Sequence, residues 1–204
     1  MDTYSDKKQQ TKDTYNISVE KIAKVFSEID PKKEDIEKTL SFISKKNPKV
    51  LELGCGNGRD ANEIIKYTND YLGIDYSEKM IEECKKNVPN GRFDIADYET
   101  FEFPKNLDVI FAFASLVHSD ERNVQKILEK AYVSLNTGGV FHMLLKYGEY
   151  HEEVQNDYAG TRAFYFYKPE NILEMAPKGF SQVYETLGDF RNLKWFTIIL
   201  KKEY

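Results

Sequence analysis

The chain has 204 residues, of which 41% are hydrophobic and 14% aromatic, and its formal charge is −5. This length predicts one domain, and the composition is that of a globular protein that folds without disulfides or metal. No apolar run approaches the ~18 residues of a membrane span, and the acidic balance gives no general attraction to nucleic acid. We therefore expect neither a membrane nor a nucleic acid as a partner.

The N-terminal segment and the cysteines bear on location. The first residues mix acids and bases, so they form neither a secretory signal nor an Arg-rich transit peptide. Two cysteines, Cys55 and Cys84, are too few for a disulfide framework and fit a reducing compartment. We expect a cytoplasmic protein. Cys55 is interpreted as a small buried filler and Cys84 as part of a core stripe.

Residues 1–14 have almost no apolar content, which predicts a mobile tail. Residues 15–47 show two helical patterns with spacings of three and four residues. The apolar positions are Val19, Ile22, Ala23 and Phe26, and then Ile36, Leu40 and Ile43. Asp30 and Pro31 are predicted as the N-cap and first residue of the second helix, which ends at Asn47-Pro48.

Residues 48–146 alternate between strand and helix signals and are predicted to form the core of the domain. The predicted strands are 50–53, 71–74, 92–95, 108–114 and 140–145. Ser77 is predicted to cap one intervening helix and Pro89 to stop it, and a longer helix carries Val124 to Leu135. This alternation predicts a parallel sheet with helices on both faces.

Residues 147–204 differ in character and are predicted to form a substrate-side insert and a C-terminal hairpin. A polar insert at 147–163 precedes an aromatic cluster, and a short helix is expected from Pro169. The β-rich runs 180–187 and 195–200, joined by a turn containing Gly188-Asp189, predict a hairpin at the sheet edge. The fold class is thus α/β: a single Rossmann-like three-layer sandwich. Its mostly parallel seven-stranded sheet carries an antiparallel C-terminal hairpin, with N-terminal helices added.

A glycine-rich turn follows the first predicted strand. Gly54, Gly56 and Gly58 allow a tight bend and the close approach of a ligand, and the following helix presents free N–H groups. A dinucleotide site needs G-x-G-x-x-G, but here the third glycine comes one residue early and Arg59 stands in its place. Glu52 lies close to the turn, where its charge would repel a pyrophosphate and favour the ammonium group of an amino-acid tail.

Asp75, at the end of the second predicted strand, can accept hydrogen bonds from both hydroxyls of a ribose. Dinucleotide enzymes share this feature, so Asp75 alone does not separate the two cofactor classes. On these residues, an oxidoreductase that uses NAD or NADP therefore remains an alternative function.

The ordered motifs of residues 49–146 resemble those of the class I S-adenosylmethionine-dependent methyltransferases. The motifs are Leu51-Glu-Leu-Gly-Cys-Gly-Asn-Gly-Arg-Asp60, Gly73-Ile-Asp-Tyr-Ser77 with Met80, Ala96-Asp97-Tyr98, Leu107 to His118 and Leu135-Asn-Thr-Gly-Gly-Val140. The stretch Gly-Asn-Gly-Arg-Asp and the segment from Leu144 to Tyr167 are similar to a bacterial subgroup of small methyltransferase-domain proteins whose substrates are undefined.

The resemblance implies S-adenosylmethionine as cofactor, with S-adenosylhomocysteine as product, and gives roles to individual residues. Gly54, Gly56 and Gly58 would surround the methionine part, with Glu52 near its ammonium group. Asp75 would hold the ribose. The other implied contacts are Tyr76 or Met80 against adenine, Asp97 and the backbone of Tyr98 at the adenine edge, Phe113 beside the sulfonium and Tyr15 covering the cofactor.

The catalytic residue is not evident from the sequence. His118 follows the fourth predicted strand and is the one candidate for a base, although backbone hydrogen bonding is an equally simple role. Lys146, Arg162 and Tyr165 are candidates for the substrate side, although the solvated surface is the favoured interpretation of each, and His142 inside its strand is interpreted as structural. The spacing of His and Cys suggests no metal site.

The predicted function is methyl transfer, by in-line displacement, to an oxygen, nitrogen or sulfur of a small-molecule acceptor. The absence of an Asn/Asp-Pro-Pro-aromatic motif after the fourth strand disfavours a nucleic-acid substrate. Besides the oxidoreductase, a protein that binds the cofactor without catalysis is a second alternative. A monomer or a homodimer is expected.

Overall fold

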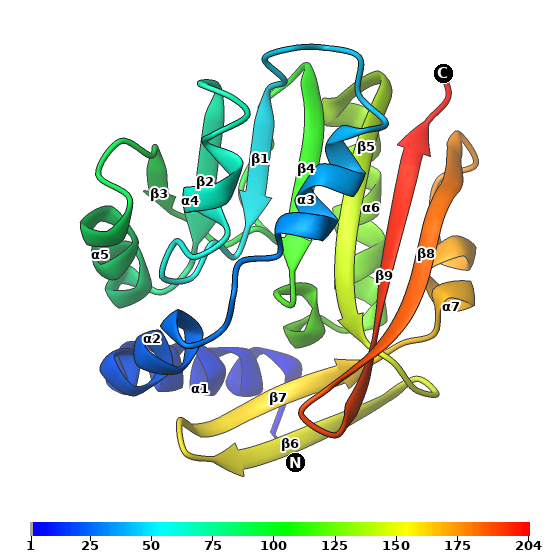
Figure 1. The fold of residues 1–204 in the computed structure, drawn as a ribbon. Helices are drawn as coiled ribbons and strands as arrows, with labels where there is room; N and C mark the ends of the chain where they lie inside the picture. The colour runs from blue at the N-terminus through cyan, green and yellow to red at the C-terminus, as the bar shows by residue number, and fades with distance from the viewer. Residues whose placement is uncertain (1) are drawn as a thin grey trace.

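A computed structural model describes residues 2–204 of the chain. The main sheet has seven strands in the order β3-β2-β1-β4-β5-β9-β8 (Figure 1). Strands β1 to β5 are parallel, β9 is antiparallel to β5, and β8 is antiparallel to β9. These strands are β1 (Val50–Leu53), β2 (Tyr71–Asp75), β3 (Phe93–Ile95), β4 (Leu107–Phe113), β5 (Leu135–Lys146), β8 (Phe180–Phe190) and β9 (Leu193–Lys202).

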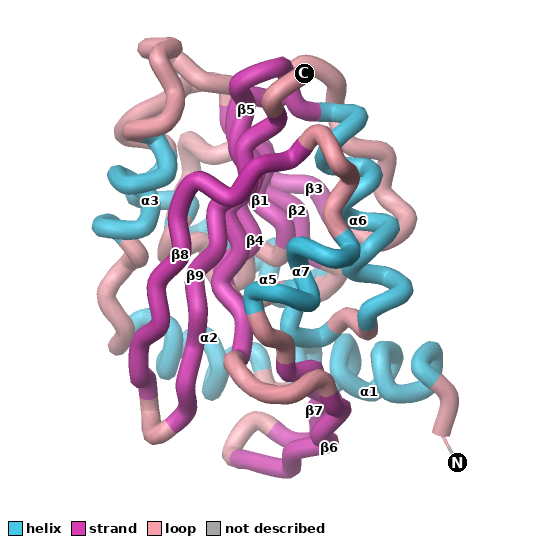
Figure 2. Tube along the Cα trace, turned by 90° about the vertical axis from the view of Figure 1, so that its right-hand side faces the viewer, coloured by secondary structure: helices cyan, strands magenta, loops and turns pink. Residues whose placement is uncertain are grey.

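Helices cover both faces of this sheet, which makes the three layers that the sequence predicted. Helix α3 lies on one side, and α6 and α7 lie on the other (Figure 2). The helices are α1 (Tyr4–Ile17), α2 (Val19–Ser27), α3 (Lys33–Leu40), α4 (Ala61–Ile64), α5 (Glu78–Asn87), α6 (Glu121–Ser134), α7 (Pro169–Met175) and the 3-10 turn η1 (Leu116–His118). Within residues 2–204, no helix has the length and apolar content of a membrane span.

The parallel strands are hydrophobic on both faces because each face is covered. Along β4, Ile110 and Ala112 pack in the cluster that includes α6 and α7, while Val109, Phe111 and Phe113 pack toward α3, α4 and α5. Both sets are almost fully buried. This double burial explains why the strand is a continuous apolar run rather than an alternating one.

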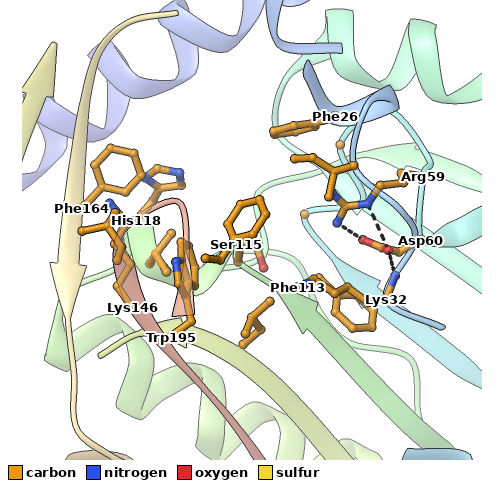
Figure 3. Close-up of a pocket in the computed structure, with 18 of the residues that line it drawn as sticks. Phe26, Lys32, Arg59, Asp60, Phe113, Ser115, His118, Lys146, Phe164 and Trp195 are labelled. Carbon is orange, nitrogen blue, oxygen red and sulfur yellow. Dashed lines mark hydrogen bonds and ion pairs between the residues drawn. The ribbon is translucent and has the colours of Figure 1, made fainter. Parts of the chain in front are cut away.

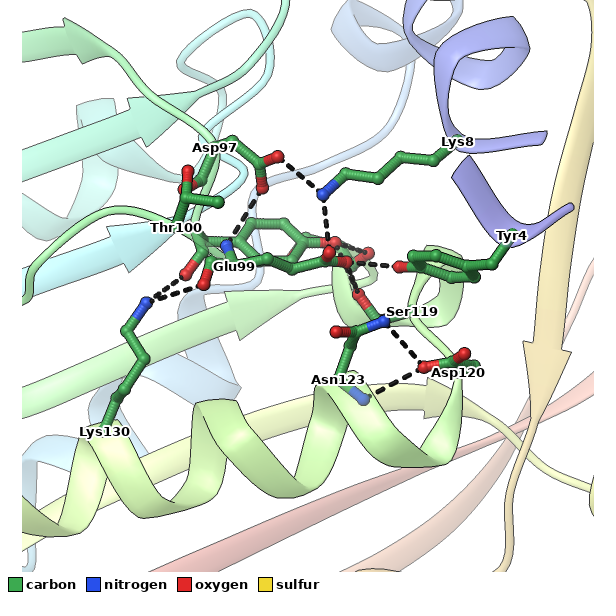
Figure 4. A network of polar contacts seen from close by, with 11 residues as sticks. Tyr4, Lys8, Asp97, Glu99, Thr100, Ser119, Asp120, Asn123 and Lys130 are labelled. Atoms are coloured by element: carbon green, nitrogen blue, oxygen red, sulfur yellow. Dashed lines mark hydrogen bonds and ion pairs between the residues drawn. The ribbon is translucent and has the colours of Figure 1, made fainter. Parts of the chain in front are cut away.

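Residues 4–17 correct the prediction of a mobile tail, since they form helix α1. Thr3 caps the helix in a reciprocal bond with Asp6. The buried residues of α1 are two threonines, and polar contacts hold it to the domain (Figure 4): Lys8 pairs with Asp97 at 2.5 Å and Glu99 at 2.6 Å. Because the helix lacks an apolar stripe, the hydrophobic pattern did not reveal it.

Several boundaries in the N-terminal and insert regions also differ from prediction. Helix α3 starts at Lys33 with Lys32 as its N-cap, not at Asp30-Pro31, and ends at Leu40. The polar insert contains a second, two-stranded sheet of β6 (His151–Asp157) and β7 (Gly160–Phe166). Strand β6 is exposed along most of its length, so it carries no burial pattern to recognise. Strand β5 begins five residues before its predicted start.

The C-terminal hairpin is confirmed, but its turn lies further along the chain. Gly188 and Asp189 remain inside β8 and pair with Trp195 and Lys194. The turn consists of Arg191 and Asn192, which have φ of 53° and 62°. Two successive positive φ values belong to the type I′ turn, whose twist matches that of the flanking strands.

Candidate cofactor and acceptor cleft

A cleft of about 440 Å³ opens at the carboxyl ends of the parallel strands. In Figure 1 this is the edge toward which β1, β4 and β5 point and at which α1, α2 and the β6–β7 hairpin gather. Figure 3 shows two groups of side chains facing each other across it: Phe26, Lys32, Arg59 and Asp60 on one side, and His118, Lys146, Phe164 and Trp195 on the other. Phe113 and Ser115, from the end of β4, lie between these groups.

The glycine turn forms one wall of this cleft. Gly54 and Gly56 line it with φ of +74° and +55°. A Cβ on Gly54 would lie 2.4 Å from the Cβ of Ser115, so only glycine fits there. Gly58, with φ of +83°, is not among the lining residues; a Cβ there would lie 2.8 Å from the Sγ of Cys84. Its role in the structure is close packing against α5.

Asp75 ties the turn to the neighbouring strand. Its Oδ2 accepts a hydrogen bond from the backbone N–H of Gly56 at 3.1 Å, and its Oδ1 accepts one from Ser77 at 2.9 Å. Burial raises the pKa of this carboxyl to about 6, and the two backbone N–H groups oppose the rise. The side chain lines the cleft beside the glycine turn. A carboxylate here has further lone pairs with which to accept hydroxyl groups.

Glu52 lies deeper in the same wall and is only 1% exposed. It accepts a hydrogen bond from the hydroxyl of Tyr71. Burial raises the pKa of Glu52 to about 8, and the nearby charge of Asp60 adds to the rise. Asp60 itself is engaged, because it pairs with Arg59 and accepts from the backbone N–H of Lys32 at 2.8 Å. Glu52 therefore holds a proton at neutral pH, and a cation brought next to it would favour its ionised form.

The predicted adenine contacts are divided between two places. Tyr76 and Tyr98 line the cleft. Asp97 lies outside it, in a second hollow that α1 and Tyr76 share, and pairs there with Lys8. Met80 is buried with Ile22 and Ala159 and does not reach the cleft. The side-chain hydroxyls of Tyr76 and Ser115 are buried without a hydrogen-bond partner in residues 2–204, so this wall is suited to a polar ligand.

Tyr15 and His118 cover the cleft from opposite elements. The Nδ1 of His118 lies 2.6 Å from the carbonyl oxygen of Ala163, which can only accept, so Nδ1 carries the proton. Burial lowers the pKa of His118 to about 3. The neutral ring then accepts a hydrogen bond at Nε2 from the hydroxyl of Tyr15, 3.0 Å away, and Nη1 of Arg162 donates to that hydroxyl at 3.4 Å. The candidate base is thus already hydrogen-bonded on both nitrogens.

The remaining wall is formed by the ends of β5, β7 and β9. Lys146 and Arg162 are buried and line the cleft, whereas Tyr165 is buried outside it and donates to Glu152. Sequence reasoning favoured the solvated surface for the first two, which the structure corrects, and it did not identify Trp195. The signal was present in the register: β5 and β9 are neighbours, and Trp195 pairs with Lys146.

The cysteines and His142 fit their structural interpretation. Both cysteines are buried, with their Sγ atoms 4.0 Å apart. His142 is fully buried in β5, and its ring lies 4.7 Å from that of Phe113.

A family model described as a methyltransferase domain matches residues 50–139. Malonyl-(acyl-carrier protein) O-methyltransferase 1 of Ilyobacter polytropus is 32% identical over 101 residues, which are 47% of this chain and 37% of that protein. This chain spans 25–37% of the length of the curated relatives that it matches here. The family model therefore covers the central part of the chain, and the curated relatives are matched over about a third of their length or less.

Solved structures extend the likeness of fold to nearly the whole chain. An S-adenosylmethionine-dependent methyltransferase of Clostridium acetobutylicum has a TM-score of 0.71 at 15% identity, covering 91% of this chain and 99% of that one. Magnesium protoporphyrin IX methyltransferase of Synechocystis, solved with S-adenosylhomocysteine, has a TM-score of 0.74 at 13% identity, covering 97% and 100%. Residues 50–139 thus match a methyltransferase domain, and nearly the whole chain shares the fold of these solved methyltransferases.

Proposed function

We propose that the protein transfers a methyl group from S-adenosylmethionine to an oxygen, nitrogen or sulfur atom of a small molecule. The observation that carries this proposal is the hydrogen bond from Gly56 to Asp75, which puts the glycine turn and the acid of the neighbouring strand on one wall of one cleft. The family match of residues 50–139 supports the same cofactor.

The proposed cofactor contacts follow the charges of that wall. Glu52 would meet the ammonium group, whose positive charge would favour the ionised form of this buried carboxyl. Asp75 would accept the ribose hydroxyls with the lone pairs that Gly56 and Ser77 leave free. Tyr76 would contact the adenine, and the backbone of Tyr98 its edge. Asp97 would need to leave Lys8 to reach the same base, so we leave it out of the set.

Bound S-adenosylmethionine supplies a methyl group that its sulfonium has already activated. The chain then has to bind the acceptor, align it and keep water out. Phe113 and Ser115 lie between the two walls, where donor and acceptor would meet (Figure 3). Tyr15, on helix α1, would cover this region. His118 holds Tyr15 rather than removing a proton, because a ring with a pKa of about 3 is a weak base.

The oxidoreductase alternative is disfavoured by the same wall. A nicotinamide dinucleotide would bring its pyrophosphate to the turn, close to Glu52 and Asp60. The third glycine, Gly58, packs against α5 and comes one residue too early for the G-x-G-x-x-G spacing that a dinucleotide site requires. Both observations favour a zwitterionic tail over a pyrophosphate.

Calorimetric titration of the purified protein with S-adenosylmethionine and S-adenosylhomocysteine tests the proposal. We expect one site per chain with micromolar affinity for both. NAD and NADP are the matched control ligands and should give no heat. A folded protein that binds neither sulfur nucleoside, or that prefers NAD, would refute the proposed function.

A further inference from the structure

We propose that the methyl acceptor is a flat small molecule bearing a carboxylate, and that the Lys146 ammonium and the Trp195 indole N–H bind this carboxylate. The inference rests on the proposed function, since it concerns the half of the cleft left free by the cofactor. It names the chemical class of the acceptor, which neither the family match nor the fold specifies.

Lys146 is a buried cation without an anion. The residue is 3% exposed at the end of β5, and its Nζ makes one hydrogen bond, to Oε1 of Gln155 at 3.2 Å. No carboxylate of residues 2–204 lies within 4.0 Å of this nitrogen. Burying a charge is costly unless it is paired. Two of its three N–H donors thus remain for a ligand.

Trp195 supplies a second free donor beside it. The two residues are partners in the β5–β9 ladder, and the Nζ of Lys146 lies 6.0 Å from the centre of the indole. The Nε1 of Trp195 is buried without a hydrogen-bond partner. A carboxylate has two oxygens with lone pairs on both sides, so one such group offers an acceptor to each of the two donors.

Two cations lie on the wall opposite Glu52 and Asp75, where the acceptor would bind. Glu52 and Asp75 lie in the wall of the glycine turn, whereas Lys146 and Arg162 lie in the wall opposite. Arg162 is already paired with Asp157, which also lines that wall. Of these two cations, Lys146 is therefore the one without an ion pair. A second ammonium group would be repelled there, and an anion attracted.

The apolar parts of this wall favour a flat molecule. The Nζ of Lys146 lies 3.6 Å from the centre of the Phe164 ring, so that ring and the indole flank the ammonium. Figure 3 shows Phe164, Lys146 and Trp195 together on the side of the cleft opposite Arg59. Because Phe164 is buried beneath Lys146 and His118, an aromatic or conjugated acid would lie against the half-buried indole of Trp195, which lines the cleft.

The test uses the intact protein saturated with S-adenosylhomocysteine and a fluorescence readout. Trp195 is the single tryptophan of the chain, so its emission reports on this wall alone. The probes are benzoate, phenylacetate and trans-cinnamate, each compared with its neutral amide. We expect at least one acid to change the emission at millimolar concentration and to bind at least tenfold more tightly than its amide.

Substitutions then locate the contact. Lys146→Met should weaken binding of the acid roughly tenfold to a hundredfold, as loss of a charge-assisted hydrogen bond does. Lys146→Arg should retain most of the affinity. Lys126→Met, at an exposed position of α6, is the matched control and should change nothing. If Lys146→Met does not fold, Trp195→Phe followed by calorimetry tests the second donor.

The outcomes separate this inference from the proposed function. Failure of S-adenosylhomocysteine to bind refutes the function itself. Normal binding of S-adenosylhomocysteine, with acids and amides bound equally or no acid bound at millimolar concentration, overturns the carboxylate inference alone. Tight acid binding that Lys146→Met and Trp195→Phe both leave intact overturns it as well, because the acid must then lie elsewhere.

Discussion

The hydroxyl of Tyr15 donates a hydrogen bond to Nε2 of His118, 3.0 Å away, and so joins helix α1 to the loop that follows β4. Their rings meet edge to face, with centroids 5.7 Å apart. The bond depends on the tautomer that the carbonyl of Ala163 imposes on His118. Tyr15 thus links helix α1 to the segment after β4 through one acceptor atom, the Nε2 of His118.

Shortening Tyr15 should reduce cofactor affinity, because its ring would no longer cover the bound cofactor. Tyr15→Ala removes both the ring and its hydrogen bond, and we expect S-adenosylhomocysteine to bind on the order of tenfold more weakly. Tyr15→Phe keeps the ring and should stay within about threefold of the original protein, since one neutral hydrogen bond contributes about 1 kcal/mol. Calorimetry measures both. Equal losses in the two variants would show that the hydroxyl, not the ring, is what matters.

The state of His118 has its own signature. We expect nitrogen-detected NMR to show a neutral imidazole protonated at Nδ1 from pH 8 down to about 4, because burial lowers the pKa of His118 to about 3. Tyr15→Phe should leave this tautomer unchanged, since the Ala163 carbonyl fixes it. A positively charged ring at pH 6 would contradict the buried environment described here.

Replacing Asp75 should abolish tight cofactor binding while the fold persists. Asp75→Asn keeps one oxygen to accept from Gly56 or Ser77 but loses the charge that would hold the ribose. Hydrogen bonds to charged groups contribute about 1.5–3 kcal/mol each, so we expect at least a tenfold loss of affinity. Circular dichroism checks the fold, and Asp70→Asn, at an exposed position, is the control. Unchanged affinity of Asp75→Asn would move the ribose site elsewhere.

The pKa of Glu52, about 8, predicts that stability of the free protein falls as pH rises. Folded protein then holds a proton on Glu52 that an unfolded chain, with a pKa near 4.5, has released, so the free energy of unfolding decreases between about pH 4.5 and 8. Asp75, with a pKa of about 6, adds the same trend below pH 6. Urea unfolding at pH 5 and 8 measures this, and Glu52→Gln should reduce the difference.

The same carboxyl couples cofactor binding to protons. An ammonium group next to Glu52 favours its ionised form, so binding below pH 8 should release a proton. Calorimetry in buffers of different ionisation enthalpy measures this release directly. Glu52→Gln should abolish its Glu52 component, and unaltered proton release in that variant would place the ammonium group elsewhere.

Two glycines with the same backbone conformation separate strain from steric conflict. Gly54 and Gly138 have φ of +74° and +81°, but a Cβ on Gly54 meets Ser115 whereas nothing lies within 4 Å of one on Gly138. Gly138→Ala should therefore cost about 1–2 kcal/mol, the backbone penalty alone. Gly54→Ala should cost several kcal/mol in denaturant unfolding, and adding Ser115→Gly should recover part of it. Equal costs would show that the contact relaxes freely.

The parts of the fold that sequence predicted well are those with a hydrophobic signal. Strand β1 was predicted with its observed bounds, and Ser77 caps α5 through Met80 as expected. Double burial makes such strands apolar runs, and the glycine turn marks where the first one ends. The resemblance added the expectation that these motifs share one cleft, and most of the residues it named do line that cleft.

The parts that sequence could not predict depend on polar or long-range pairing. Helix α1 attaches through lysines whose partners, Asp97, Glu99 and Glu78, lie more than sixty residues away. Trp195 reaches the cleft only through its register with Lys146. No local pattern encodes either relationship. Asp97, for which the resemblance implies an adenine contact, lies in the neighbouring hollow and pairs with Lys8, and its role stays a prediction.

The attachment of α1 has a consequence for how the cleft opens. Ion pairs at Lys7, Lys8 and Lys12, together with threonine hydroxyls, hold this helix, and ion pairs weaken in salt whereas apolar packing does not. Raising ionic strength should therefore loosen the helix that carries Tyr15 and hasten ligand exchange, while the sheet beneath keeps its stability. The helix at the entrance to the cleft is thus held by ion pairs, whereas the sheet that carries the site is held by apolar packing.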